Sequence, residues 1–331
     1  MSEQPEVVVI TGPGSGIGRA IARRFAAPGI RIGLVGRNED SLAAARDEIE
    51  RAGGEALPLP TDVADPDAVE AAADAVEKAL GPIDVWINNS MTTVFAFFAD
   101  VEADEFRRAT EVTYLGSVWG TKAALKRMRE RDRGTIVQVG SAMAYRGIPL
   151  QSPYCGAKHA LKGFLDSLRC ELRNEGSGVH VTQVQLPGLN TPQFDHCRSK
   201  MPKHPRPVAP VYQPEVAADA VHWAAHHRRR EVWVGIPTVY TIVGNKLAPW
   251  LAERYLAKTA VEGQQGDRPP TEKNSDGNLF DPHGGDPGAH GPFDDEAHPR
   301  SPQWWLSRHR RMVGAAALTA AATGAALFQR R

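Results

Sequence analysis

A tyrosine and a lysine stand four positions apart in the stretch QSPYCGAKHA, at Tyr154 and Lys158. On a helix this spacing places both side chains on one face, one turn apart. A free phenol has a pKa near ~10 and is a poor acid–base catalyst at neutral pH, but a neighbouring ammonium group lowers that pKa. Ser141 precedes Tyr154 by thirteen residues. Together these residue types suit proton transfer, and the alternative is an ordinary amphipathic helix with a buried tyrosine and a surface lysine.

A glycine-rich turn near the N-terminus could bind phosphate groups. The stretch TGPGSGIG follows a short apolar run and precedes a helix that is expected to begin near Ile17. At such a place glycines permit a tight turn, and the backbone N–H groups at the helix start can meet a pyrophosphate. A flexible surface loop is the alternative. The residues expected to bind a dinucleotide through this turn are Gly12, Gly14, Ser15, Gly16, Ile17 and Gly18.

The end of the second predicted strand indicates which dinucleotide binds. An acidic residue there would accept a hydrogen bond from the ribose 2′-hydroxyl of NAD, but VGRNE has Gly36 in that place, followed by Arg37. Because a guanidinium group can bind a 2′-phosphate in a fork, NADP(H) is predicted over NAD(H). The alternative is a solvated surface arginine. We further expect Asp62 and Val63 to contact the adenine and Asn88 to support the cofactor from below.

Alternating strand and helix patterns place these residues at one edge of a sheet. Strands are predicted at residues 6–10, 30–36, 55–63, 83–89, 134–141 and 179–188. Helical patterns lie between them, including one long helix over residues 103–130. This alternation predicts an α/β fold, namely a single-domain, Rossmann-type doubly wound parallel sheet. Ligands of such sheets lie beyond the carboxyl ends of the strands, where every motif described above falls.

Taken in order, these motifs resemble those of the short-chain dehydrogenase/reductases in their NADP-preferring form. The resemblance is carried by the glycine turn, INN, the spacing from Ser141 to Tyr154, Tyr-x-x-x-Lys and PGLNT. It covers about residues 7–235 and continues more loosely to residue 257. It implies a hydride transfer between NADP(H) and an alcohol/carbonyl substrate, with Tyr154 as the general acid–base and Ser141 as a donor to the substrate oxygen. Lys158 would support Tyr154 and bind the nicotinamide ribose.

The same resemblance implies further cofactor contacts and one departure. Pro187, Gly188 and Thr191 of PGLNT are expected to hold the nicotinamide end of the cofactor. The family's usual asparagine, three residues before a glycine, is replaced by Thr113 before Gly116. We expect a proton relay through Thr113 and a water molecule, or an altered relay, because threonine has a hydroxyl but lacks the two polar groups of an amide.

Composition limits the other function classes. The chain has 331 residues, a formal net charge of zero and three cysteines without metal-ligand spacing. These values argue against nucleic acid as a partner, predict no metal site and fit a reducing, cytoplasmic setting. Residues 192–215 are expected to form a lid over the substrate, with Phe194, Met201, Pro207 and Tyr212 lining an apolar pocket. A homo-oligomer is also expected from the resemblance.

The chain divides by composition into three parts. Residues 1–260 form the predicted catalytic domain, residues 261–303 are rich in Gly, Pro and Asp and are predicted to be a linker or an extended tail, and residues 304–331 form a basic, Ala-rich C-terminal helix. Residues 312–328 are uncharged and would measure about 26 Å as a helix, just short of the ~30 Å hydrocarbon core. We therefore expect membrane association through this segment, with Trp304 and Trp305 in the headgroup region. A peripheral helix, a helix docked on the protein and an unstructured tail are the alternatives.

The leading functional hypothesis is an NADP(H)-dependent oxidoreductase for a small-molecule alcohol or carbonyl substrate, and a lipophilic one is suggested by the lid and the tail. An epimerase or dehydratase is a second hypothesis, because the same Ser–Tyr–Lys set serves such chemistry. A catalytically silent NADP-binding scaffold is the third, and Thr113 is its only support.

Overall fold

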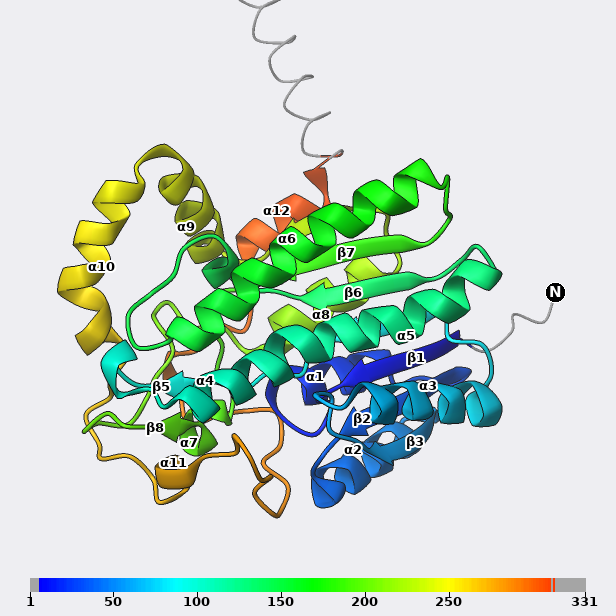
Figure 1. Cartoon of the computed structure of the whole chain (residues 1–331), viewed down its shortest axis with the longest axis horizontal. Coiled ribbons are helices and arrows are strands. Elements are labelled where there is room, and N and C mark those ends of the chain that lie inside the picture. The colour runs from blue at the N-terminus through cyan, green and yellow to red at the C-terminus, as the bar shows by residue number, and fades with distance from the viewer. Residues whose placement is uncertain (1–5, 311, 313–331) are drawn as a thin grey trace, which may run out of the picture.

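Figure 1 shows the computed structural model of the chain, in which residues 6–310 and 312 are described. At the centre of this described part is a seven-stranded parallel sheet with the order β3-β2-β1-β4-β6-β7-β9. The predicted doubly wound fold is therefore confirmed. The strands are β1 (Glu6–Thr11), β2 (Ile30–Gly36), β3 (Glu55–Pro60), β4 (Val85–Asn88), β6 (Thr135–Val139), β7 (His180–Gln185) and β9 (Glu231–Trp233).

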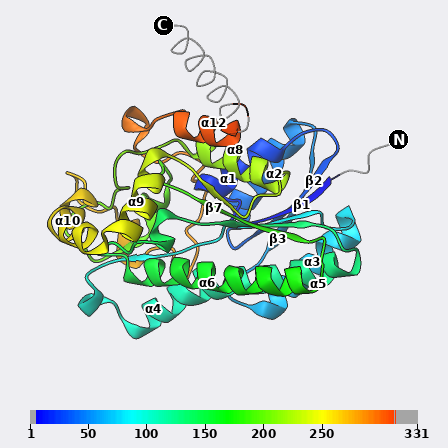
Figure 2. The same ribbon diagram turned by 90° about the horizontal axis from the view of Figure 1, so that it is seen from above.

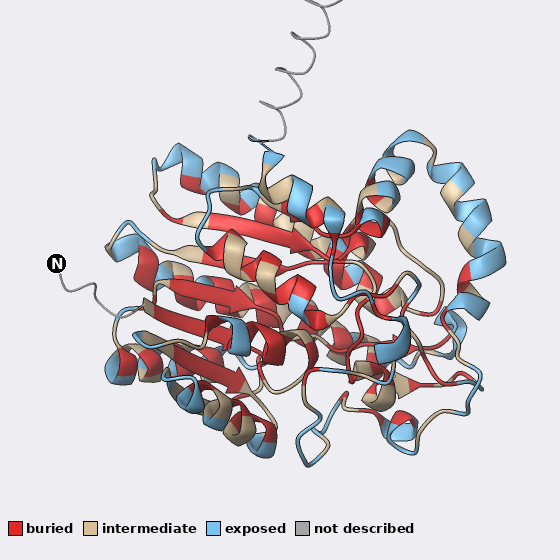
Figure 3. Cartoon of the chain, turned by 180° about the vertical axis from the view of Figure 1, so that it is seen from behind, coloured by how far each residue is buried: buried red, intermediate tan, exposed pale blue. Residues whose placement is uncertain are grey.

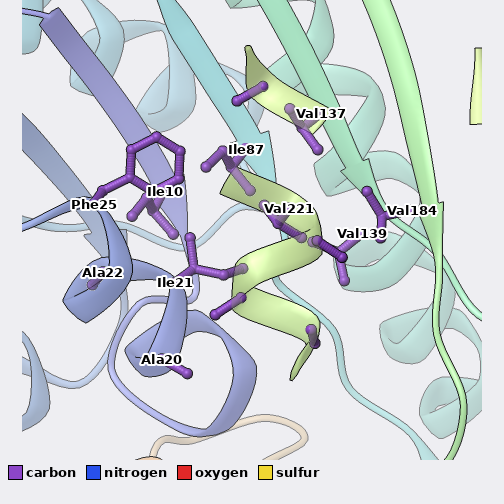
Figure 4. Close-up of a cluster of buried hydrophobic side chains, with 14 of the residues drawn as sticks. Ile10, Ala20, Ile21, Ala22, Phe25, Ile87, Val137, Val139, Val184 and Val221 are labelled. Atoms are coloured by element: carbon purple, nitrogen blue, oxygen red, sulfur yellow. The ribbon is translucent and has the colours of Figure 1, made fainter. Parts of the chain in front are cut away.

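Helices cover both faces of the sheet, as the view from above shows (Figure 2). One face carries α1 (Gly16–Phe25), α2 (Glu39–Arg51) and α8 (Pro214–Ala225), and the other carries α3 (Pro66–Leu80), α5 (Gly116–Glu130) and α6 (Ser152–Asn174). Because parallel strands are buried on both sides, they consist of nearly continuous apolar runs, and Figure 3 shows them as buried. In Figure 4, Ile10, Ile87 and Val137 of the strands lie near Ile21 of α1 and Val221 of α8.

Short polar residues start two of the helices that flank the sheet. The Asn38 side chain accepts a hydrogen bond from the Ser41 N–H at 2.9 Å before α2. The Asp65 carboxylate accepts from the N–H groups of Asp67 and Ala68 before α3. These caps satisfy N–H groups that have no partner inside the helix, so the loops at the carboxyl ends of β2 and β3 are fixed in place.

Two elements differ from the predicted pattern. The helix expected over residues 103–130 is divided into α4 (Ala103–Thr110), a π-helical turn at Glu111–Leu115, and α5. The seventh strand, β9, was not predicted because it is only three residues long and follows a charged run. A small parallel pair, β5 (Val94–Phe95) with β8 (Arg198–Ser199), lies apart from the main sheet.

Beyond β9 the chain forms a helical pair and then crosses back over the domain. α9 (Ile236–Leu247) and α10 (Pro249–Gly263) lie at one side of the molecule (Figure 1). Residues 264–301, here named the C-terminal strap, follow and contain the short helix α11 (Lys273–Asp276). The strap was expected to bury little, yet Gln264, Asn274 and Leu279 are fully buried in it. It is therefore packed on the catalytic domain, while the domain boundaries themselves stay predictions.

The last described helix, α12 (Pro302–Arg308), corrects one expectation about the tail. Trp304 is buried against the domain, and its indole N–H donates to Asp219 at 2.8 Å. It therefore belongs to the protein core rather than to a headgroup region, whereas Trp305 is exposed. In residues 6–310 and 312, no helix has the length and apolar character needed to span a membrane. The predicted span at 312–328 lies outside the described residues, apart from Met312.

Candidate active site

A cavity of about 530 Å³ lies at the carboxyl ends of the strands, where the strand order reverses between β1 and β4. Its volume falls within the range of about 300–1,000 Å³ that is usual for small-molecule sites. Most of the predicted site residues line it. They are Gly12, Gly14, Ser15, Gly16, Ile17, Gly18, Arg37, Asp62, Val63, Ser141, Tyr154, Lys158, Pro187, Gly188 and Thr191. Their roles stay predictions, but the fold brings them to one place.

The glycine turn between β1 and α1 is held in a shape that side chains would prevent. Gly12 and Gly16 have positive φ angles of 66° and 53°. A Cβ atom on Gly18 would overlap the Gly12 carbonyl oxygen, and one on Gly14 would overlap the Ser41 hydroxyl. The close approach of the backbone leaves a shallow cradle at the start of α1, and such a cradle suits a pyrophosphate group. The turn therefore fits the dinucleotide that the sequence predicts.

Arg37 and Asp62 both line the cavity, at the end that lies beyond β2 and β3. Asp62 pairs with Arg108 from α4, which together with Arg37 keeps the pKa of Asp62 below its usual range despite burial. Burial, together with the charge of Arg108, lowers the pKa of Arg37. The Arg37 guanidinium donates to the carbonyl oxygens of Asn278 and Phe280 in the strap. Arg37 is thus half-buried and oriented, which differs from a solvated surface arginine.

Ser141, Tyr154 and Lys158 meet at the centre of the cavity. Ser141 follows β6, and Tyr154 and Lys158 lie on α6, with the Lys158 Nζ 5.4 Å from the centre of the Tyr154 ring. Lys158 is buried, and its ammonium donates to the Val139 carbonyl oxygen at 2.8 Å. The spacing of one helical turn therefore places phenol and ammonium side by side, as expected.

The pKa values of this pair differ from the expectation. Burial raises the pKa of Tyr154 to about 12, although a hydrogen bond with Ser141 opposes the rise. Burial also lowers the pKa of Lys158 to about 8, because the charged form loses its hydration. The chain's own groups thus keep the phenol protonated at neutral pH. A lowered phenol pKa would have to come from charges that the chain itself does not supply.

Two predicted site residues do not line the cavity. The Asn88 side chain accepts from the Trp86 indole and donates to Thr121, both on the far side of β4. Thr113 is fully buried, and its hydroxyl donates to the Thr92 carbonyl oxygen at 2.9 Å and accepts from the Thr92 N–H at 3.0 Å. Asn88 thus braces β4 against α5, and Thr113 holds the segment after β4.

Several residues that the sequence reasoning missed shape the site. Asn89, next to Asn88, lines the cavity and donates to the carbonyl oxygens of Thr11 and Gly12. Gln185, fully buried at the end of β7, accepts from the Ser141 N–H at 2.8 Å and donates to Glu231 at 2.7 Å. Asn89 is the second asparagine of the INN motif, one position after the predicted Asn88, whereas a glutamine inside a strand gave no signal of its role.

The substrate end of the cavity is mainly apolar. Phe194 and Pro207 of the predicted lid line it, whereas Met201 is buried in a cluster with Phe95 and Tyr212 packs in the main core. Pro237 and Tyr240 of α9 also line it, as do Met143, Ile148, Leu189, Val208 and Ala209. In the described part of the chain, no group of three or more His, Cys, Asp or Glu residues is arranged to hold a metal ion.

The chain is similar to known proteins in sequence and in fold. Residues 6–202 match the family described as short chain dehydrogenase. An uncharacterized oxidoreductase of Bacillus subtilis, YxnA, is 33% identical over 282 residues, which is 83% of this chain and 78% of that protein. The 3-dehydrosphinganine reductase of Danio rerio is 34% identical over 65% of this chain and 66% of its own length. The alcohol dehydrogenase of the archaeon Thermococcus sibiricus, solved with 5-hydroxy-NADP, superposes with a TM-score of 0.61 and 26% identity, covering 69% of this chain and 95% of that one.

Proposed function

Because the chain belongs to the short-chain dehydrogenase/reductase family, and is thus one of its oxidoreductases, we propose that it transfers hydride between NADP(H) and a lipophilic alcohol/carbonyl pair. The observation that carries this proposal is the meeting of Ser141, Tyr154 and Lys158 in a cavity that begins at the glycine turn. A dinucleotide that starts on the turn and extends along the carboxyl ends of the strands reaches these three side chains.

The protonation states of the chain suit the proton-donating step of a carbonyl reduction. Bound NADPH would supply the hydride to the carbonyl carbon. Tyr154, whose pKa burial raises to about 12, enters this step as a neutral phenol that can give its proton to the carbonyl oxygen. Ser141 lies beside it and can donate a hydrogen bond to the same oxygen, which orients the substrate. Lys158 supplies a positive charge next to the phenolate that remains.

NADP(H) is favoured over NAD(H) by the residues at the end of β2. Gly36 carries no carboxylate that would repel a 2′-phosphate, and Arg37 lines the same end of the cavity. The alcohol dehydrogenase with the similar fold was solved with 5-hydroxy-NADP, which supports the same choice. The lipophilic substrate is supported by the apolar lining near Phe194 and Tyr240 and by the relative named 3-dehydrosphinganine reductase. A homo-oligomer, a cytoplasmic location and membrane association through the tail stay predictions of the sequence.

The first test is a titration of the full-length chain with NADPH and with NADH, followed by nicotinamide fluorescence. NADPH is expected to bind at least about tenfold more tightly, and Arg37→Ala should remove most of this preference, because a bidentate phosphate contact is lost. Arg46→Ala is the matched control, since Arg46 lies on the exposed side of α2 and contacts Asp47. Tighter binding of NADH would contradict the cofactor choice, and absence of binding by both would contradict the oxidoreductase.

The second test follows NADPH consumption with a panel of long-chain ketones. Tyr154→Phe should lower turnover by about 10²–10⁴-fold and leave the NADPH affinity unchanged, because the phenylalanine keeps the ring but has no proton to give. Full activity of this variant would exclude Tyr154 as the acid. Substrate conversion without net NADPH consumption would favour the epimerase or dehydratase over the reductase.

A further inference from the structure

The C-terminal strap, residues 264–301, is fastened to the domain on both sides of the cavity. On the substrate side, the buried Asn274 side chain donates to the carbonyl oxygens of Phe194 and Cys197 at 3.1 and 2.8 Å. On the side of the glycine turn, the Gly16 N–H donates to the Gly288 carbonyl oxygen at 2.9 Å. Arg19, which is buried, donates to both carboxylate oxygens of Asp286 at 3.1 and 3.2 Å. The strap therefore spans the cavity between two fixed ends.

Between these ends the strap forms part of the cavity wall. Its backbone is held by Asn38, which donates to the carbonyl oxygens of His283 and Gly285, and by Arg37. Carbonyl oxygens of the strap thus accept from two side chains just before α2 that also line the cavity. The strap residues that line the cavity are Lys273, Asn278, Pro282, His283, Gly284, Gly285, Asp286 and Pro287.

Three basic side chains line the cavity at this wall, namely His196, Lys273 and His283. His283 of the strap lies 6.5 Å, ring centre to ring centre, from His196 of α7 (Gln193–His196). The Nε2 atom of His283 is buried and has no hydrogen-bond partner among the described residues. Burial, together with the charges of His283 and Lys273, lowers the pKa of His196 to about 4.

Two carboxylates of this region are already paired with basic groups. Asp195 binds His204 at 2.9 Å and Arg268 at 2.8 Å, and Asp286 binds Arg19. Two imidazoles and an ammonium on one wall of a cavity are suited to a phosphate group, because its oxygens can accept hydrogen bonds from them and its charge is opposite to that of the ammonium.

We propose that the strap belongs to the cofactor site, in which His283 and Lys273, which both line the cavity, bind the phosphate groups of the dinucleotide. The inference rests on the proposed function, since it requires a phosphate-bearing cofactor in this cavity. It adds binding residues that lie far beyond residues 6–202, where the family match ends. The cofactor is then enclosed by the chain's own C-terminal part.

The test compares the full-length protein with two variants of the wall by calorimetric titration with NADPH and NADH. His283→Phe keeps a flat ring without a nitrogen, and Lys273→Met keeps the apolar stem without the charge. Each is expected to weaken NADPH binding by about tenfold. A loss with NADPH alone assigns the 2′-phosphate as the bound group, and an equal loss with NADH assigns the pyrophosphate. Both outcomes support the proposal.

His298→Phe is the matched control, because His298 belongs to the same strap but packs on Tyr212 with ring centres 5.5 Å apart, outside the cavity wall. It should bind NADPH like the unchanged protein, and equal melting temperatures show that all variants are folded. As a second readout, NADPH should slow hydrogen exchange at residues 278–288 in the unchanged protein. Unchanged affinity of both wall variants in a protein that binds NADPH would overturn this inference and leave the proposed function standing. A protein that binds neither nucleotide would overturn both.

Discussion

At the scale of single residues, the site combines side chains that the sequence reveals with others that only the structure reveals. The helical spacing of Tyr154 and Lys158 sufficed to place them together, because α-helix geometry is regular. The two asparagines of INN could not be separated in this way. Successive residues of a strand point to opposite faces, so a shift of one position exchanges a cavity residue for a core residue. The Asn88 side chain accordingly points from β4 to Thr121 of α5, and Asn89 holds the glycine turn.

Gln185 is a positioning residue for Ser141, and its replacement tests this role. Gln185→Leu leaves the buried Ser141 N–H without its acceptor, a cost of about 1–3 kcal/mol. We expect kcat to fall by about tenfold while the affinity for NADPH stays unchanged, as measured by steady-state kinetics and by titration.

Gln183→Leu is the matched control for this prediction. Gln183 is equally buried on the same face of β7, two residues away, but makes no contact with Ser141, so its variant should keep kcat. Equal losses in both variants would mean that Gln185 acts only through packing.

At the scale of elements, the π-helical turn at Glu111–Leu115 decides where Thr113 points. Such turns insert an extra residue into a helix and are frequent near functional sites. The sequence predicted one helix over residues 103–130, since a π-turn keeps helical propensity and leaves no simple mark on the pattern. Within this turn, the Thr113 hydroxyl forms hydrogen bonds with both the N–H and the carbonyl group of Thr92. Thr92 lines the cavity, so the turn fixes one of its walls.

The role of Thr113 can be separated into support and proton relay. Thr113→Val has the same shape but leaves the Thr92 N–H and carbonyl group unpaired, at a cost of about 1–3 kcal/mol for each buried group. We expect a lower melting temperature and a higher KM, whereas Thr113→Ser should restore both toward the original values. A large fall in kcat with an unchanged melting temperature would instead support the relay.

The position of the strap on the domain could not be predicted from the sequence. Its composition, rich in Gly, Pro and Asp, indicates a segment that cannot form a core. Several of the contacts that hold it use backbone carbonyl oxygens of Asn278, Phe280, His283 and Gly288, which every sequence has. Composition and periodicity carry no information about such contacts. The sheet, in contrast, followed directly from its alternating apolar runs.

At the scale of the whole molecule, charged contacts couple the strap to the domain and make its attachment depend on pH. His290 of the strap lies 2.8 Å from Glu215 of α8 and 3.0 Å from Asp294. Burial alone would lower the pKa of His290, but these two carboxylates raise it above its usual value. A raised pKa means that the protonated form is favoured in the folded chain.

The stabilisation by His290 is therefore complete below the pKa of the unfolded chain, about 6.5, and is lost as the pH rises through the higher pKa of the folded chain. The melting temperature of the unchanged protein should exceed that of His290→Gln by more at pH 6 than at pH 8. The comparison of two proteins at each pH removes the contribution of other titrating groups. A difference that does not change with pH would contradict this coupling.

The contact between Arg19 and Asp286 joins positions 267 residues apart in the chain. During synthesis, the glycine turn leaves the ribosome long before the segment that covers it is translated. The Rossmann core can assemble first, because its strands and helices are near neighbours in sequence, but contacts across so long a separation form late. In a nascent chain, the cavity beside the glycine turn is thus open on one side until almost the whole polypeptide has emerged. A chain that stops before residue 286 would have a folded sheet and an unfinished binding pocket.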